Sequence, residues 1–296
     1  MLKAGSKAGI VCCSNARKKK HGAEIKYLEK TLLSMGLLPV FSDYIYERDD
    51  LSGGTARERA QALMDFYRDD SVKVIFDISG GDIANGILPY LDYDLIAGSG
   101  KSFWGYSDLT TVINAMYAKT GKASVLYQVR NLIYDHREQQ SLDFKRTVLE
   151  NKDDLFHIDY EFIRQDKVYA LKKMSGIVVG GNIRCFLKLA GTEFMPDLQD
   201  KILLLEGYHG TVPQMETYLC QLEQLGAFRK AAGILLGTFT QMEEENCKPD
   251  MRTLIQEFTC GRIPVAVTKN IGHGTDAKGI VIGKEKNFLD NYSLQV

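Results

Sequence analysis

The sequence predicts an α/β protein in which a mostly parallel sheet, covered by helices on both faces, is followed by a smaller mixed domain. Two observations support this fold class. Strand-like and helix-like segments alternate through the first half of the chain, which is the order of a parallel sheet with crossover helices. The second half is richer in short apolar runs separated by glycines. At 296 residues, the chain is long enough for two ordinary domains or for one large one.

Each element of the first half follows from its apolar pattern. Short continuous apolar runs predict buried strands, and apolar residues at a spacing of three to four predict helices. The expected strands cover 8–12, 38–41, 72–78 and 103–104, and the expected helices cover 22–35, 55–67 and 112–117. Ligands of such sheets bind at the carboxyl ends of the strands, so we expect the site there.

The chain changes character between about residues 131 and 166, where charged and amide side chains replace the apolar runs. We interpret this stretch as the connection between two domains, because few buried contacts are expected to cross it. The N-terminal α/β domain then covers 1–130 and the C-terminal domain covers 167–296. Short strands are expected in the latter at 176–181, 202–205, 233–237 and 264–268.

Charge and composition exclude several function classes. The chain has 37 Lys and Arg against 38 Asp and Glu, a net charge of -1, so no electrostatic attraction to nucleic acid or to an acidic membrane is expected. The N-terminus has a short apolar run followed by positive charges, the reverse of a secretory signal, and no later segment is long enough to span a bilayer. We therefore expect a cytoplasmic protein.

The six cysteines, Cys12, Cys13, Cys185, Cys220, Cys247 and Cys260, show no paired spacing of the kind that holds a metal. We expect reduced structural thiols. No metal and no cofactor is predicted.

Ser107 is the strongest candidate for a catalytic residue. It lies in Gly105-Tyr106-Ser107-Asp108, between a predicted strand and a predicted helix, where a sharp turn exposes the hydroxyl. The amides that open the following helix point the same way and can hold the anion formed when a carbonyl is attacked. Leu109 replaces the second glycine of the usual elbow motif, so a helix N-cap is the alternative interpretation from spacing alone.

Glu206 ends the apolar run 202–205, and its carboxylate should emerge at the end of a buried strand. His273 lies between two glycines, just after the predicted strand 264–268. There it could accept the Ser107 proton through one ring nitrogen while the other donates to Glu206. His209 is the rival base, but it is only three residues from Glu206, which makes it difficult to place its ring between Glu206 and Ser107.

Two glycine-containing segments need separate consideration. Residues 98–102 have the sequence Gly-Ser-Gly-Lys-Ser, which is similar to the end of a phosphate-binding loop. Leu95 stands where the first glycine would be, and an apolar strand follows instead of a helix, so we set nucleotide hydrolysis aside.

Gly80 and Gly81 follow the strand 72–78 and form either a tight turn or a place where a backbone amide approaches an oxyanion.

A longer segment carries a specific resemblance. Residues 79–121 hold a double glycine, then Leu-Pro-Tyr-Leu-Asp-Tyr-Asp at 88–94, then Gly-Tyr-Ser-Asp at 105–108, and end in Ala-Lys-Thr-Gly. This pattern resembles the LD-carboxypeptidase family, which also contains the microcin-immunity peptidases. The likeness continues at 189–192, 196–198, 201–206 and 270–276.

The resemblance implies a catalytic triad and a fold. Family members use a serine, a glutamate and a histidine in that chain order, and the matching positions are Ser107, Glu206 and His273. It implies the backbone N–H groups of Gly81 and Asp108 as the oxyanion hole. It also implies a doubly wound N-terminal domain of the class I glutamine-amidotransferase or flavodoxin-like kind, a β-barrel-like C-terminal domain with the active site between them, and a homodimer.

The implied function is that of a serine carboxypeptidase which removes the terminal D-alanine from murein tetrapeptides in peptidoglycan recycling. One alternative is a microcin-immunity-type peptidase that cleaves a peptide-nucleotide antibiotic. Another is an inactive binding homologue, because Ser79, Cys12-Cys13 and Tyr127-Gln128 depart from the family pattern. Arg130 and Asn182 are candidates for binding the substrate's terminal carboxylate.

Overall fold

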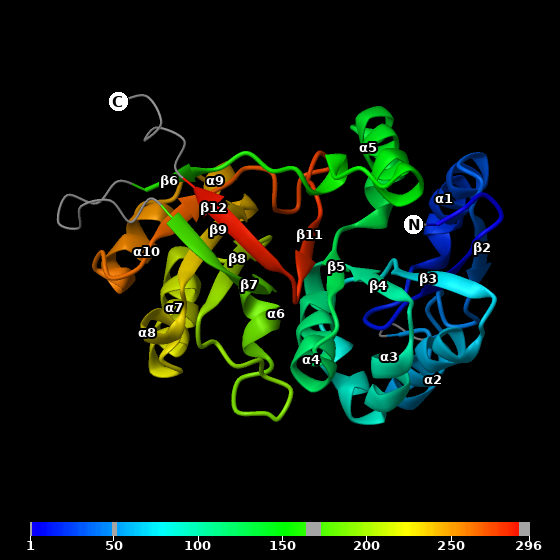
Figure 1. Cartoon of the computed structure of the whole chain (residues 1–296), viewed down its shortest axis with the longest axis horizontal. Helices are drawn as coiled ribbons and strands as arrows, with labels where there is room; N and C mark the ends of the chain where they lie inside the picture. The colour runs from blue at the N-terminus through cyan, green and yellow to red at the C-terminus, as the bar shows by residue number, and fades with distance from the viewer. Residues whose placement is uncertain (1, 49–51, 164–172, 290–296) are drawn as a thin grey trace.

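The computed structural model describes residues 2–48, 52–163 and 173–289. It contains two six-stranded sheets, each covered by helices, which form the two halves of the molecule (Figure 1). The predicted α/β class, with a doubly wound N-terminal sheet and a mixed C-terminal sheet, is confirmed. A single hydrophobic cluster extends from helices of the first half to strands of the second, so the halves share part of their core.

The first sheet is parallel except at one edge. Its strands, in spatial order, are β11 (Ile280–Ile282), β5 (Ser124–Leu126), β4 (Ser102–Gly105), β3 (Val72–Asp77), β1 (Lys7–Val11) and β2 (Leu38–Phe41). Only β11 runs antiparallel to its neighbour, β5. Strands β1, β3, β4 and β5 run in the same direction, so their carboxyl ends lie together at one end of the sheet.

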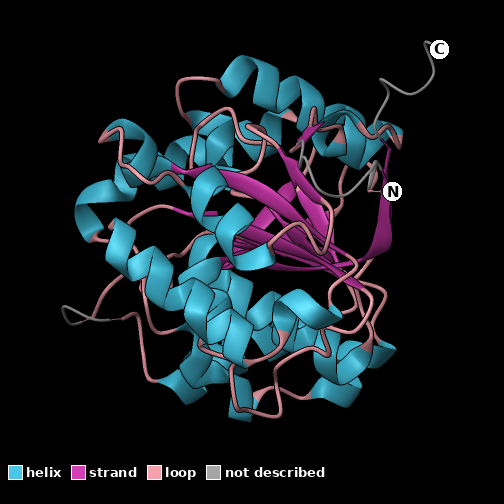
Figure 2. Ribbon diagram, turned by 90° about the vertical axis from the view of Figure 1, so that its left-hand side faces the viewer, coloured by secondary structure: helices cyan, strands magenta, loops and turns pink. Residues whose placement is uncertain are grey.

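Helices cover both faces of this sheet, as Figure 2 shows for the molecule as a whole. One face packs against α1 and α5, and the other against α2, α3 and α4. The helices of the chain are α1 (Gly22–Ser34), α2 (Ala56–Arg68), α3 (Tyr93–Gly98), α4 (Thr110–Thr120), α5 (Arg137–Glu150), α6 (Ile183–Leu187), α7 (Val212–Gln224), α8 (Ala227–Lys230), α9 (Thr240–Glu244) and α10 (Met251–Thr259). Short 3₁₀ helices cover 19–21, 84–90, 107–109, 129–133 and 154–156.

The second sheet has four parallel strands flanked by two antiparallel ones. Its spatial order is β12 (Glu285–Leu289), β7 (Lys173–Asn182), β8 (Lys201–Gly207), β9 (Gly233–Phe239), β10 (Val265–Val267) and β6 (Glu161–Phe162). The Tyr160 hydroxyl, next to β6, donates to the Leu289 carbonyl at the end of β12 and accepts from the Leu289 amide, both at 3.0 Å. The two edge strands thus approach each other, which curls the sheet toward a barrel.

Helix α4 fastens the first half of the molecule to the second. The Asn114 side chain both accepts from the Gly180 amide, at 2.8 Å, and donates to the Gly180 carbonyl, at 2.9 Å. Thr110 accepts from the backbone of Asn182, and Thr111 donates to that of Cys185. All these groups are buried, where hydrogen bonds are costly to leave unmade. Helix α4 therefore fixes the turn that precedes it, residues 107–109, relative to β7 and α6.

Two segments differ from the expected domain division. Residues 137–150 of the expected connection form α5, whose Phe144 and Val148 pack into the core of the first sheet. Most of its polar side chains face solvent, whereas Gln140 and Asp143 are buried, where they contact the Tyr127 hydroxyl and the Lys278 ammonium. Strand β11, from the expected C-terminal domain, completes the first sheet. The boundary expected at residue 166 lies outside the described residues.

No helix in the described parts of the chain combines the length and the apolar character needed to cross a bilayer.

Candidate active site

Ser107 lies immediately after β4, on a turn that leads through a 3₁₀ helix (107–109) into α4. Its φ is 57°, in the left-handed region that residues other than glycine rarely adopt. Such a conformation costs about 1–3 kcal/mol and persists only where the surrounding structure enforces it. Here β4 on one side and the anchored helix α4 on the other hold the turn, which exposes the Ser107 hydroxyl at the sheet edge.

His273 comes from the loop after β10 and reaches Ser107 with one ring nitrogen. Its Nε2 lies 3.1 Å from the Ser107 Oγ, and its Nδ1 lies 2.8 Å from Oε2 of Glu206. The neighbouring Gly272 lets this loop approach β9, because a Cβ there would fall 1.7 Å from the Thr238 hydroxyl oxygen. The Glu206 contact favours the tautomer with a proton on Nδ1, which leaves Nε2 free to accept the Ser107 proton.

Glu206 is the penultimate residue of β8 and is fully buried. The pairing of β8 with β9 shifts register between Leu205 and Gly207, and such an irregularity can redirect a side chain. Oε2 accepts from the Tyr106 hydroxyl at 3.2 Å as well as facing His273. Oε1 has no hydrogen-bond partner among the described residues. Burial, followed by the nearby Glu206 charge, raises the pKa of Tyr106, so its hydroxyl remains a donor.

Two tyrosines hold the His273 ring between them. Tyr106 contacts it edge to face, with ring centroids 4.9 Å apart, and Tyr208 stacks on it at 4.7 Å and 22°. Sequence reasoning missed both residues. Their positions, one residue before Ser107 and two after Glu206, were the available signal.

The Asp108 side chain is buried and does not take part in the Ser107, His273 and Glu206 chain of contacts. It forms an ion pair with Lys188, accepts from the Ser14 hydroxyl at 2.6 Å and accepts from the Ala84 amide at 2.8 Å. These contacts join the ends of β1 and β4 to the segment after β3. Its carboxylate therefore holds the turn that carries Ser107.

Gly81 has a φ of 115° and lies against Asn15, whose side chain would be 2.3 Å from a Cβ added at this position. The backbone N–H of Asn15 donates to the Gly80 carbonyl at 3.0 Å, and the side-chain Oδ1 of Asn15 accepts from the backbone N–H of Asp82 at 2.8 Å. The glycine segment is thus fixed against the end of β1. Asn15 was another residue that the sequence did not single out.

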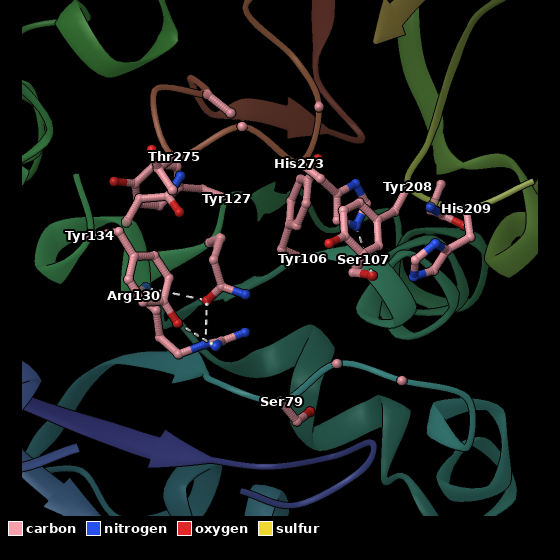
Figure 3. Close-up of a pocket in the computed structure, with 18 of the residues that line it drawn as sticks. Ser79, Tyr106, Ser107, Tyr127, Arg130, Tyr134, Tyr208, His209, His273 and Thr275 are labelled. Atoms are coloured by element: carbon pink, nitrogen blue, oxygen red, sulfur yellow. Dashed lines mark hydrogen bonds between the residues drawn. The ribbon is translucent and has the colours of Figure 1, made fainter. Parts of the chain in front are cut away.

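A cavity of about 580 Å³ brings these groups together. Its lining includes Gly81, Ser107, His273, Tyr208 and Arg130. In the view of Figure 3, Ser107 and His273 lie between Arg130 and Tyr134 on one side and Tyr208 and His209 on the other. The cavity draws on loops from both halves of the chain.

The remaining candidates are placed as follows. His209 lines the same cavity, but its ring packs against Tyr208, with centroids 4.2 Å apart, and the histidine in contact with both Ser107 and Glu206 is His273. Gly98 ends α3 and Ser102 begins β4, so residues 98–102 do not open a helix. Among the described residues, no group of three or more His, Cys, Asp or Glu side chains is arranged to hold a metal ion.

Comparison with known proteins gives consistent matches over most of the chain. The LD-carboxypeptidase N-terminal domain matches residues 8–127, and the LD-carboxypeptidase C-terminal domain matches residues 175–287. A Bacillus subtilis protein named "Probable murein peptide carboxypeptidase" is 26% identical, with 95% of this chain and 88% of the relative covered.

Two further matches carry microcin names. The microcin C7 self-immunity protein MccF of Escherichia coli is 28% identical, over 73% of this chain and 71% of that protein. The crystal structure of an MccF-like protein from Bacillus anthracis has a TM-score of 0.84 at 26% identity, with 98% of this chain and 95% of that chain covered. With both halves of the fold matched by the two domains of one family, the chain belongs to the LD-carboxypeptidase family, the serine-type peptidases of family S66.

Proposed function

We propose that this protein is a serine carboxypeptidase that removes the terminal D-alanine of murein tetrapeptides, with Ser107, His273 and Glu206 as its catalytic triad. One observation carries the proposal. The Ser107 hydroxyl, the His273 ring and the Glu206 carboxylate form a continuous chain of contacts of 3.1 and 2.8 Å at the wall of a cavity. Three such groups in this order can activate a hydroxyl for attack on an amide.

The reaction would proceed in two halves. Ser107 Oγ attacks the carbonyl of the scissile amide while His273 Nε2 takes its proton and then gives it to the leaving amine. The resulting acyl-enzyme is released by water, which His273 activates in the same way. Glu206 stabilises the imidazolium formed in each half, and its burial strengthens this interaction.

The developing oxyanion would be held by the backbone N–H groups of Gly81 and Asp108. Gly81 lines the cavity with Ser107, and Asp108 is the next residue along the turn. The Asn15 contacts and the Lys188 ion pair fix the two segments before substrate arrives. Preorganised donors of this kind need no rearrangement when charge develops.

The murein peptide is favoured as substrate by the name of the Bacillus subtilis relative, which covers nearly the whole chain. We further propose that the protein acts in the cytoplasm on recycled peptides and forms a homodimer, as the family resemblance implies. A cavity of about 580 Å³ is within the usual range for small-molecule sites.

The test is mass spectrometry of the purified protein incubated with a diaminopimelate-containing tetrapeptide, beside Ser107→Ala and His273→Ala. Release of D-alanine by the wild type alone supports both the reaction and the nucleophile. If the wild type is folded and reacts with a fluorophosphonate but releases no D-alanine, the substrate assignment is wrong. A folded protein that neither labels nor cleaves would instead be an inactive binding homologue.

A second candidate is cleavage of an amide in a peptide-nucleotide antibiotic. The relatives with microcin names support it, as does the Tyr208 ring, which lines the cavity and is 45% exposed. An aromatic face of this kind can stack on a base. Incubation with an aminoacyl sulfamoyl adenosine, followed by detection of the free amino acid, separates this activity from D-alanine release.

A further inference from the structure

The cavity contains one guanidinium without an acidic partner, that of Arg130. Three lysine and arginine side chains of the described residues line this cavity: Arg130, Arg184 and Lys278. Arg184 forms an ion pair with Asp82, and Lys278 forms one with Asp143. By contrast, no carboxylate of the described residues lies within 4.0 Å of the Arg130 guanidinium.

Neutral groups hold the Arg130 side chain in place. Its Nε donates to Gln128 Oε1 at 3.2 Å, and its Nη1 donates to the Tyr134 hydroxyl at 2.7 Å (Figure 3). These two bonds use two of the five guanidinium hydrogens. The orientation is therefore set before any ligand binds, and hydrogens remain for an incoming acceptor. The Tyr134 hydroxyl accepts from Arg130, so its own hydrogen is also available.

The charge of Arg130 is poorly compensated. Burial lowers its pKa first, and the like charge of Arg17 lowers it further. A guanidinium remains protonated in spite of such effects. Arg17 is itself paired with Glu24 at 3.0 Å, and both of these charges of the N-terminal segment interact electrostatically with Arg130. An anion that enters the cavity would offset this unfavourable arrangement of positive charge.

The fold also places Arg130 on the wall of the same cavity as Ser107. It lies on the 3₁₀ helix 129–133 that follows β5, and Ser107 follows β4. The two strands are parallel neighbours, with Gly105 paired to Leu126, so both residues emerge at the same edge of the sheet. The other candidate, Asn182, uses its side-chain oxygen to accept from the Cys185 amide at the start of α6.

We propose that Arg130, with Tyr134 and Gln128, binds a carboxylate of the peptide substrate and thereby selects acidic peptides for attack by Ser107. This rests on the proposed function, since a murein tetrapeptide carries the relevant groups. They are the free terminal carboxylate of D-alanine, the side-chain carboxylate of diaminopimelate and the free carboxylate of the glutamate residue. Arginine is suited to this task because its planar fork matches a carboxylate with two parallel hydrogen bonds.

The test measures binding by titration calorimetry in the Ser107→Ala protein, which separates it from turnover. Adding Arg130→Gln should weaken binding of the diaminopimelate tetrapeptide by about 10–100-fold, the usual effect of losing a hydrogen bond to a charged group. Three analogues each lack one carboxylate: a terminal amide, a lysine in place of diaminopimelate and an isoglutamine in place of glutamate. The analogue that lacks the bound carboxylate should bind equally well with and without the Arg130→Gln substitution.

Arg130→Lys is the second variant. It keeps the charge but loses the fork, so it should bind with intermediate affinity, and thermal unfolding reports whether either variant is folded. Arg68→Gln, on the exposed face of α2, is the control and should bind as the parent does. The proposal is overturned if the folded Arg130→Gln protein binds the tetrapeptide with normal affinity, or if the substitution weakens the binding of all three analogues equally. If the Ser107→Ala protein binds the tetrapeptide as expected but the protein with Ser107 intact does not cleave it, only the proposed function is contradicted.

Discussion

The Ser107 Oγ and the His273 Nε2 lie 3.1 Å apart although 166 positions separate them in the chain. Ser107 is on the N-terminal sheet, and His273 is on a loop of the C-terminal one, so the contact depends on how the halves dock. Helix α4, whose Asn114 is bonded to both backbone groups of Gly180, fixes that docking a few residues from Ser107. The contact between Ser107 and His273 therefore depends on the same hydrogen bonds that hold the two halves together.

His273→Ala should lower kcat by about 10²–10⁴-fold, the usual contribution of a general acid–base group, without unfolding the protein. His209→Ala is the matched change, because that ring also lines the cavity but the ring that reaches Ser107 is His273. We expect His209→Ala to have a far smaller effect. Steady-state kinetics of D-alanine release, with circular dichroism as a check on folding, measures both. Equal losses in the two variants would contradict the assignment.

The contacts of Glu206 predict a graded pair of variants. Glu206→Gln removes the charge that stabilises the imidazolium and should lower kcat by about 100-fold or more. Tyr106→Phe removes only the 3.2 Å hydrogen bond to Oε2 and should cost about 10-fold at most. Phenylalanine keeps the ring contact with His273, so a Tyr106→Phe loss as large as that of Glu206→Gln would show that the Tyr106 hydrogen bond matters as much as the Glu206 charge.

Patterns local in sequence predicted most of the fold. The strand predicted at 38–41 coincides with β2, and the helices predicted at 22–35 and 55–67 match α1 and α2 within one residue at each end. These elements have apolar patterns that can be read locally, and α2 also has a clear cap, in which Thr55 and Glu58 bond to each other's backbone amide. Helix α5 was missed because its mean character is polar and its apolar residues are few.

The candidate site also contains residues that local sequence patterns predict and residues that they do not. Ser107 and Glu206 follow from their places at strand ends, whereas His273 depended mainly on the family resemblance. Tyr208 and Asn15 were not singled out, because their contacts are with residues far along the chain. Strand β11 was not predicted for the same reason, since nothing within residues 280–282 indicates pairing with β5.

Gly81→Ala should destabilise the protein and reduce activity. The residue has a φ of 115°, and a Cβ would lie 2.3 Å from the Asn15 side chain, so a strain of about 1–3 kcal/mol is expected. Gly80→Ala is the matched substitution, because no heavy atom lies within 4 Å of a Cβ there. Urea unfolding should separate the two variants clearly. Similar midpoints would show that the segment adapts to the side chain.

Lys188→Met should destabilise the protein by about 3 kcal/mol, because it leaves the fully buried Asp108 carboxylate without its cation. Lys119→Met is the control, since its partner Glu193 is 70% exposed and such surface pairs contribute at most about 1 kcal/mol. Chemical unfolding of both variants measures the difference. Equal effects would mean that the Ser14 and Ala84 hydrogen bonds suffice to hold the Asp108 carboxylate.

The cysteines should differ sharply in reactivity. Burial raises the pKa of Cys12, Cys13 and Cys185, so these thiols stay protonated near neutral pH, whereas Cys260 is exposed. Iodoacetamide reacts with thiolates, so peptide mapping should find Cys260 labelled in the native protein and the three buried thiols labelled only after denaturation.

The same three thiols predict how stability changes with pH. The unfolded chain releases their protons above about pH 8.5, while the folded protein retains them, so the unfolding free energy should fall as pH rises above that value. Denaturant unfolding at about pH 7 and about pH 9.5 brackets this range and measures the fall, and Cys185→Ala should reduce it because one of the three raised groups is then absent. If iodoacetamide labels Cys12 or Cys13 in the native protein, the end of β1 opens readily, and so does the segment that holds Asn15 against Gly81. The folded protein would then not retain these protons, and the predicted fall in stability would be smaller.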